Sequence, residues 1–178
     1  MPILKVPVTD ADHSEGGDAK APVTLVEYGD YECPACGEAY PIVKAVQKHF
    51  GRRLRFVFRN FPLTQIHPEA ESAAETAEFA AGHGRFWQMH DALYENQDQL
   101  GPQLYLALAE RLGLSGTALS QALADGAGRE KVRDDFRGGL SSGVNGTPTF
   151  YINGRRHDGS FDAADLIAAI DAQLAHAG

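Results

Sequence analysis

Two cysteines separated by two residues are the most reactive feature of this 178-residue chain, and they are its only cysteines. Cys33 and Cys36 enclose Pro34 and Ala35. This spacing occurs in redox pairs, in which one thiolate attacks a disulfide and the second thiol resolves the mixed disulfide. It also supplies half of a zinc site, but zinc needs about four ligands. The sequence has no second C-x-x-C and no H-x-x-x-H, so redox chemistry is favoured over a metal site or an inert pair.

The composition indicates one ordinary domain, or one domain that carries an insertion. Apolar residues make up 43% of the chain, enough for a real core at this length. With 24 acidic and 16 basic side chains, the formal charge of −8 argues against a nucleic-acid partner. No apolar run approaches the roughly 20 residues that a membrane-spanning helix needs. We therefore expect no membrane span, and the sequence suggests neither a cofactor nor a metal.

Residues 1–20 are rich in Asp, Gly and Pro, and we expect a loosely ordered lead-in there. They contain no apolar core of the kind that a secretory signal requires. If Met1 is the natural start, we expect a cytoplasmic protein, where a C-x-x-C pair serves redox or metal chemistry more often than a structural disulfide. A chain trimmed of its signal would look the same.

The cysteines lie between two predicted strands. Residues 23–29 are rich in β-forming residues, and residues 54–59 alternate in the way of a strand. Between them, residues 34–50 carry apolar side chains at helical spacing, with Pro41 expected to kink the helix. Strand, helix and strand within about 40 residues predict a βαβ unit with parallel strands.

The remainder predicts a helical insertion followed by a hairpin and a last helix. Residues 67–140 contain no convincing strand, and helices are expected to begin near Pro68, Arg85 and Pro102. Strand residues return at 149–152, followed by the hairpin pair Asn153-Gly154 and a helix after Asp162. We therefore expect an α/β domain from residues 21–66 and 141–178, with an inserted helical subdomain at 67–140.

This arrangement predicts different roles for the two cysteines. Cys33 lies at the start of the helix, where unpaired N–H groups and the helix dipole favour a thiolate. Cys36 lies about one turn inside and is more shielded. We therefore expect Cys33 to attack a disulfide and Cys36 to resolve the mixed disulfide, or the reverse sequence to run.

Two separated motifs give the sequence a family resemblance. Cys33-Pro34-Ala35-Cys36 and the segment GVNGTPTF at 143–150 resemble the bacterial DsbA-like thiol-disulfide oxidoreductases of the thioredoxin superfamily. The likeness extends from Ala21 onward. It implies an α/β thioredoxin-like fold with an inserted all-helical subdomain. It also implies an enzyme that acts on dithiol or disulfide proteins, or on small thiols such as glutathione.

The resemblance assigns further site residues. Pro148 matches a proline that takes the cis form and faces the cysteines, which leaves the backbone of Thr147 for an extended substrate to pair with. Glu27 matches a buried acid that would pass a proton to or from Cys36 through water. The alternative for Glu27 is a glutamate on an edge strand, facing solvent.

Pro34 and Ala35 are expected to tune the reduction potential. Strongly oxidising members of the family carry Pro-His between the cysteines, and Ala35 offers neither a donor nor a charge. Asp30 and Glu32 should disfavour a further negative charge at Cys33. We therefore expect a pKa of Cys33 that is lowered, but less than in the strongest oxidants, and the sequence leaves the direction of electron flow open.

Two other functions are consistent with the fold. One is a glutathione-dependent transferase or isomerase, although such proteins typically have a single Ser or Cys at this motif. The other is a non-catalytic metal-binding or interaction module. Among nearby residues, Tyr31 is a candidate for lining an apolar groove around Cys33. His90 is expected to be a core residue rather than a catalytic one, and Phe86-Trp87 to pack the inserted helices onto the α/β part of the chain.

Overall fold

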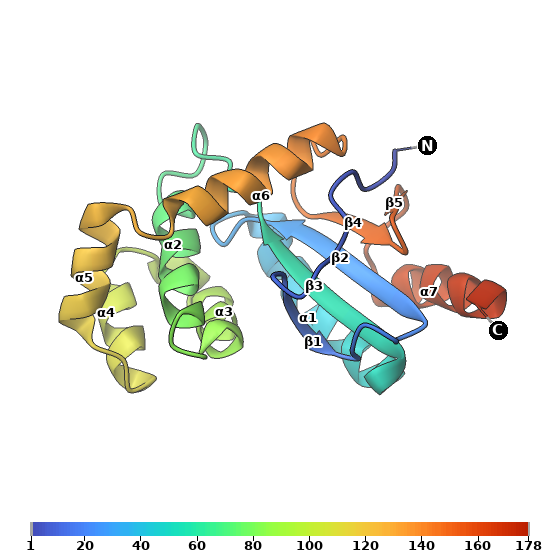
Figure 1. Ribbon diagram of the computed structural model, residues 1–178, viewed down its shortest axis with the longest axis horizontal. Coiled ribbons are helices and arrows are strands. Elements are labelled where there is room, and N and C mark those ends of the chain that lie inside the picture. The colour runs from blue at the N-terminus through green and yellow to red at the C-terminus, as the bar shows by residue number, and fades with distance from the viewer. Residues whose placement is uncertain (1, 178) are drawn as a thin grey trace. The chain divides into compact units, whose positions relative to one another are not determined.

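The computed structural model describes residues 2–177, which include a mixed five-stranded sheet with the strand order β1-β3-β2-β4-β5. The arrows of β2 and β3 point the same way, as a βαβ unit requires (Figure 1). The other neighbouring pairs are antiparallel. The strands are β1 (His13–Gly16), β2 (Val23–Gly29), β3 (Leu54–Asn60), β4 (Thr149–Ile152) and β5 (Arg155–His157).

The predicted hairpin forms between β4 and β5. Asn153 and Gly154 both have positive φ angles, 48° and 83°, which is the conformation that a two-residue hairpin turn needs. The side chain of Asn153 also accepts a hydrogen bond from the backbone N–H of Thr24 at 2.8 Å. The turn is therefore tied to the start of β2, the strand with which β4 pairs.

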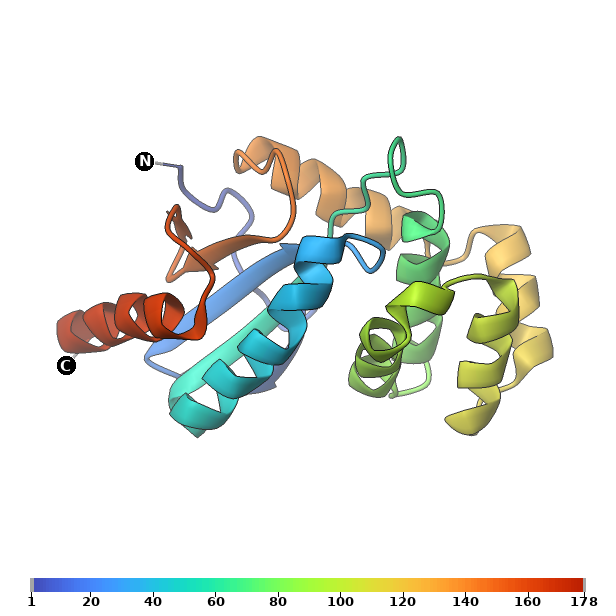
Figure 2. The ribbon, with the colours of Figure 1, turned by 180° about the vertical axis from the view of Figure 1, so that it is seen from behind.

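Helix α1 (Pro34–Phe50) carries one buried face at helical spacing, which explains why this segment folds as a helix. Pro34 occupies its first position, where a missing N–H costs nothing, and Pro41 lies inside it on the exposed side. The helix lies in front of the sheet in Figure 2. Helix α7 (Ala163–Ala177) packs against β2 and β4. The buried residues of α1 are Cys36, Ala39, Val43, Val46 and Phe50.

The expectation of a loosely ordered lead-in over residues 1–20 was wrong. Residues 13–16 form β1, which pairs with β3. The side chain of Arg59 on β3 donates two hydrogen bonds to the carboxylate of Asp12, at 2.8 and 3.0 Å. It also donates to the carbonyl oxygens of Val6 and Pro7. Polar contacts with β3, which is distant in sequence, hold this segment in place. The local pattern of apolar residues therefore gave no indication that the segment would be ordered.

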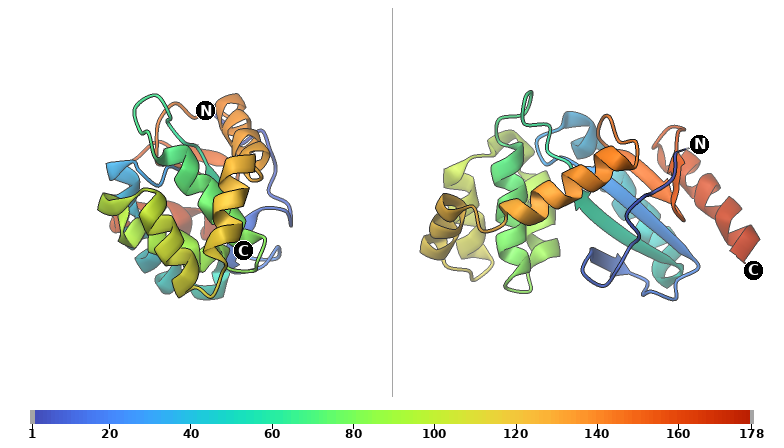
Figure 3. Two further views of the ribbon diagram at one scale, coloured as in Figure 1. Left: turned by 90° about the vertical axis from the view of Figure 1, so that its left-hand side faces the viewer. Right: turned by 45° about the horizontal axis from the view of Figure 1, so that its top comes forward.

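The inserted segment is helical, as predicted. Residues 61–148 contain no strand, and α2 packs against α3, α4 and α5. Figure 3 shows these helices from two further directions. No helix in the described part of the chain is both long and apolar enough to cross a membrane. The helices are α2 (Ala70–Ala81), α3 (Phe86–Glu95), α4 (Pro102–Arg111), α5 (Gly116–Asp125) and α6 (Arg129–Ser141), with the 3-10 turns η1 (Gly51–Arg53) and η2 (Gln97–Gln99).

The chain divides into two compact units whose boundaries differ from the expected ones. The first, which we call the sheet unit, comprises the chain up to Gly29, Glu38–Arg59 and the chain from Arg137 onward. The second, the helical unit, comprises Asp30–Gly37 and Asn60–Phe136. The segment with both cysteines thus groups with the inserted helices, because side-chain hydrogen bonds tie it to them.

Candidate functional site

Cys33 immediately precedes the first residue of α1. Its carbonyl oxygen accepts the hydrogen bond of the Gly37 N–H at 3.0 Å, which is the first intrahelical bond and makes Cys33 the N-cap residue. Its own N–H donates to the carbonyl oxygen of Asp30 at 3.1 Å. Cys33 therefore lies where the first N–H groups of α1 have no acceptor within the helix and where the helix dipole favours a negative charge.

The two cysteines differ in burial. Cys33 is 6% exposed and Cys36 is fully buried, and the structure contains both as thiols. Pro34 between them is exposed and Ala35 is partly exposed. Cys33 is thus the more accessible of the two thiols, and the predicted order of attack stays a prediction.

The carboxylate of Asp30 holds the chain just before the cysteines. It is 1% exposed and accepts hydrogen bonds from the backbone N–H groups of Glu32 and Leu63 at 2.8 and 2.9 Å. It also contacts Nδ1 of His67 at 2.7 Å. Glu32 in turn accepts from the N–H of Glu69, at the start of α2. Both carboxylates thus accept hydrogen bonds from backbone N–H groups within residues 63–69, which ties the chain just before the cysteines to that segment.

Tyr31 does not line an exposed groove. Its side chain is 1% exposed, and its hydroxyl lies 2.9 Å from Nδ1 of His90. His90 is buried and contacts the rings of Phe86, Trp87 and Tyr31. His90 is thus a hydrogen-bonded core residue, as predicted, and the Phe86-Trp87 pair packs within the helical unit.

Sequence reasoning missed Gln97, on the turn η2. Its side-chain N–H₂ group donates to the carbonyl oxygens of Tyr31 and Cys33, at 2.9 and 2.8 Å. It is a polar residue 64 positions after Cys33, and nothing in its local sequence marks it. The one available signal was indirect, a glycine in the first turns of α1 at Gly37.

The sheet unit holds the other predicted site residues. The peptide bond between Thr147 and Pro148 is cis. Glu27 lies on β2 opposite Phe150 of β4 and is 3% exposed. Because β2 has a neighbouring strand on each side, the alternative of a solvent-facing glutamate on an edge strand was wrong. Pro148 immediately precedes β4, whose first two residues, Thr149 and Phe150, pair with Tyr28 and Glu27.

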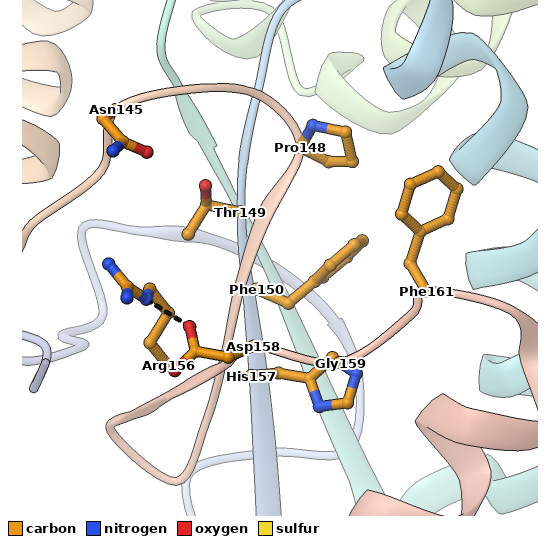
Figure 4. Close-up of a pocket in the computed structure, with 9 residues that line it drawn as sticks. All are labelled: Asn145, Pro148, Thr149, Phe150, Arg156, His157, Asp158, Gly159 and Phe161. Atoms are coloured by element: carbon orange, nitrogen blue, oxygen red, sulfur yellow. Dashed lines mark hydrogen bonds and ion pairs between the residues drawn. The ribbon is translucent and has the colours of Figure 1, made fainter. Parts of the chain in front are cut away.

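A hollow lies beside Pro148 in the sheet unit (Figure 4). Figure 4 shows the rings of Pro148, Phe150 and Phe161 along one side of it. Arg156 and Asp158 form an ion pair along another side. The hollow thus offers both apolar and charged contacts.

The described residues offer no ready-made metal site. Between residues 2 and 177, no group of three or more His, Cys, Asp or Glu side chains lies in a position to hold a metal ion.

Several curated proteins share sequence with this chain over a limited part of their length. A protein of Salinispora arenicola named Na(+)/H(+) antiporter NhaA 1 is 47% identical over 173 residues, which is 97% of this chain and 26% of that protein. A protein of Nitrosospira multiformis named Na(+)/H(+) antiporter NhaA is 39% identical over 97% of this chain and 28% of its own length. The chain thus spans about a quarter of the length of these relatives.

Solved structures and a family profile agree on the fold. BdbD from Bacillus subtilis superimposes with a TM-score of 0.87 at 25% identity, over 98% of both chains. The α-DsbA1 protein of Wolbachia pipientis superimposes with a TM-score of 0.83 at 20% identity, over 98% of this chain and 96% of the other. The profile of the family described as Thioredoxin matches residues 9–172. The chain therefore belongs to the thioredoxin family, and its fold is that of the DsbA-like proteins.

Proposed function

We propose that this protein is a thiol-disulfide oxidoreductase that exchanges disulfides with protein or small-molecule thiols through Cys33 and Cys36. The observation that carries the proposal is the position of Cys33 as the N-cap residue of α1, with Cys36 buried one turn further on. This position favours the thiolate, which is the form that attacks a disulfide. The DsbA-like fold is independent support.

In the reductive direction, the Cys33 thiolate attacks one sulfur of a substrate disulfide. A mixed disulfide forms, and the other substrate sulfur leaves as a thiolate and takes up a proton. The thiolate of Cys36 then attacks the sulfur of Cys33, and the second substrate sulfur leaves. The protein ends with a disulfide between Cys33 and Cys36 and has lost two electrons, which the substrate has gained as two thiols. The oxidative direction reverses every step.

Two residues and one hollow of the sheet unit have proposed supporting roles, and the roles of the residues rest on the family resemblance. The backbone of Thr147, ahead of Pro148, would pair with an extended substrate. Glu27, which is 3% exposed, would carry a proton to or from Cys36 through water. The hollow beside Pro148 would accept a substrate side chain. Glu27→Gln should therefore alter the pH dependence of disulfide exchange more than its rate at the optimum.

Single-cysteine variants test the proposal. Cys33→Ser should abolish exchange with a peptide disulfide, and Cys36→Ser should still attack and accumulate one mixed disulfide per chain. Mass spectrometry locates the adduct without ambiguity, because the chain has two cysteines and each variant keeps one. Equal residual activity in both variants would contradict the assigned roles. Saturable glutathione binding without exchange would favour a transferase instead, and stoichiometric zinc lost in Cys33→Ser would favour a metal-binding module.

The direction of electron flow is accessible by equilibration in glutathione buffers. Potentials of proteins with this fold extend from about −270 mV for thioredoxin to about −120 mV for DsbA. Because Ala35 supplies no donor to the Cys33 thiolate, we propose a potential below the oxidising end of that range. A potential close to that of DsbA would contradict this role of Ala35.

The antiporter relatives suggest a candidate partner class. Their names apply to proteins about four times the length of the matched stretch, so we propose no transport activity for this chain. We propose instead that membrane proteins are among its exchange partners. Trapping with Cys36→Ser on isolated membranes, with Cys33→Ser as the control, tests this. The cytoplasmic location predicted from residues 1–20 stays a prediction that cell fractionation would test.

A further inference from the structure

Gln97 connects two segments of the helical unit, the turn η2 and the backbone around the start of α1. One side-chain nitrogen, Nε2, donates to the carbonyl oxygen of Tyr31 at 2.9 Å and to that of Cys33 at 2.8 Å. A primary amide has two N–H bonds, so both N–H bonds of Gln97 are used on the backbone of residues 31–33. The two acceptors lie on either side of Glu32, and the chain between them cannot rotate without breaking one of these bonds.

Gly37 provides the space that this side chain occupies. A Cβ atom on Gly37 would lie 2.9 Å from Cδ of Gln97 and closer still to its Oε1 atom. Glycine inside a helix is destabilising relative to alanine, and Gly37 is the fourth residue of α1. The position of Gln97 explains why the helix contains a glycine one residue after Cys36.

The carbonyl oxygen of Cys33 thereby accepts two hydrogen bonds. One comes from the N–H of Gly37 at 3.0 Å and the other from Gln97. Together they fix the peptide group of Cys33 in the N-cap orientation, which keeps this residue at the positive end of the helix dipole. The Gln97 amide also offsets the partial negative charge of the two carbonyl oxygens that it contacts. Without this donor, that charge would disfavour the Cys33 thiolate.

We propose that Gln97 is a positioning residue for Cys33, whose amide fixes the N-cap peptide so that the thiolate is favoured, and that Gly37 is required to admit it. The inference rests on the proposed function, because it concerns the attacking thiol of that reaction. A role in folding alone would change stability without changing the reactivity of Cys33. The test therefore measures the pH dependence of that reactivity.

The first experiment compares Gln97→Glu with Gln99→Glu, both in a Cys36→Ala background, so that alkylation by iodoacetamide reports Cys33. Gln97→Glu keeps the side-chain shape but places a carboxylate oxygen against one or both carbonyl oxygens. Gln99 is exposed on the same turn, so Gln99→Glu adds the same charge without touching them. We expect Gln97→Glu to raise the pH midpoint of alkylation by about one unit relative to Gln99→Glu, a tenfold loss of thiolate at low pH. Equal midpoints in the two variants would overturn the proposal.

The second experiment displaces the amide without changing it. In Gly37→Ala the new Cβ would push away the end of a flexible side chain, which is a small steric cost, and alanine favours the helix. We expect unchanged or higher stability towards urea and a raised alkylation midpoint. The alkylation midpoint of the double variant Gly37→Ala/Gln97→Ala should be no higher than that of Gln97→Ala alone. The reason is that both substitutions remove the same interaction, the contact of the Gln97 amide with the backbone. An unshifted midpoint in Gly37→Ala, or additive shifts, would overturn the proposal.

The outcomes separate this inference from the proposed function. If the wild-type chain exchanges disulfides while the Gln97 and Gly37 variants match their controls, the positioning role alone fails. If the wild-type chain exchanges none and Cys33 is alkylated like an ordinary exposed thiol, the proposed function fails. If the wild-type chain exchanges none but its alkylation midpoint is lowered and rises in both Gly37→Ala and Gln97→Ala, the proposed function fails and the positioning role stands.

Discussion

Replacing Asp30 with asparagine removes a buried charge that holds the chain just ahead of Cys33. The carboxylate now accepts two backbone N–H groups, from Glu32 and Leu63, and contacts His67. An asparagine keeps one acceptor oxygen and turns the other into a donor, so one of the two backbone N–H groups is left facing an N–H₂ group. A buried donor without a partner costs about 1–3 kcal/mol, and each bond that changes from a charged to a neutral acceptor loses about 1 kcal/mol more. We expect a total loss of about 3 kcal/mol.

Urea unfolding of Asp30→Asn, analysed by linear extrapolation, measures this loss. The fluorescence of Trp87 reports the unfolding of the helical unit, because this residue is the single tryptophan of the chain and lies in the same unit as Asp30. Glu110→Gln is the matched control, since it removes the same charge from an exposed position on α4 of that unit. A loss below about 1 kcal/mol, similar to that of the control, would refute the argument that the carboxylate holds this turn.

Three further predictions concern buried polar groups. Burial raises the pKa of Glu75 in the folded protein above its value in the unfolded chain. The stability that comes from protonated Glu75 is therefore fully present below about pH 4 and is lost as the pH rises through the pKa of the folded protein. Glu75→Gln should therefore gain stability relative to the wild type between pH 4 and pH 7, and a constant difference over that range would contradict this. Asp12→Asn leaves Arg59, whose side chain is 3% exposed, without its ionic partner, and should lower the free energy of unfolding in urea by about 3–5 kcal/mol. An unchanged free energy of unfolding would mean that solvent reaches the pair. Tyr31→Phe removes the hydroxyl that lies 2.9 Å from His90 and should cost about 1 kcal/mol, which a value near zero would disprove.

Much of the fold followed from local sequence patterns. The strands at 23–29 and 54–59, the helix between them and the turn at Asn153-Gly154 were predictable, because side-chain periodicity and turn chemistry are encoded within a few residues. The helical character of the insertion was predictable for the same reason. Strand β1 was not, because its pairing depends on β3 and on Arg59, some 40 residues away, and its own sequence has no apolar alternation.

The sequence by itself determined which atoms can react. Two cysteines at C-x-x-C spacing, at a predicted helix start between two predicted strands, indicated redox chemistry because the sequence has no second C-x-x-C and no H-x-x-x-H to complete a zinc site. The burial of Glu27 also followed from its apolar neighbours once the family resemblance was taken into account, although the sequence alone left an exposed edge strand open.

Only the tertiary structure decided what surrounds Cys33. Tyr31 is buried against His90 rather than exposed beside the thiol, and the carboxylate of Asp30 is held by donors from residues 63–67. Gln97 reaches the backbone of Cys33 across 64 residues, through the space that Gly37 leaves. The physical reason is the same in each case. A thiol's reactivity depends on groups within a few ångströms in space, and the chain brings those groups together from segments whose own sequences carry no sign of the contact.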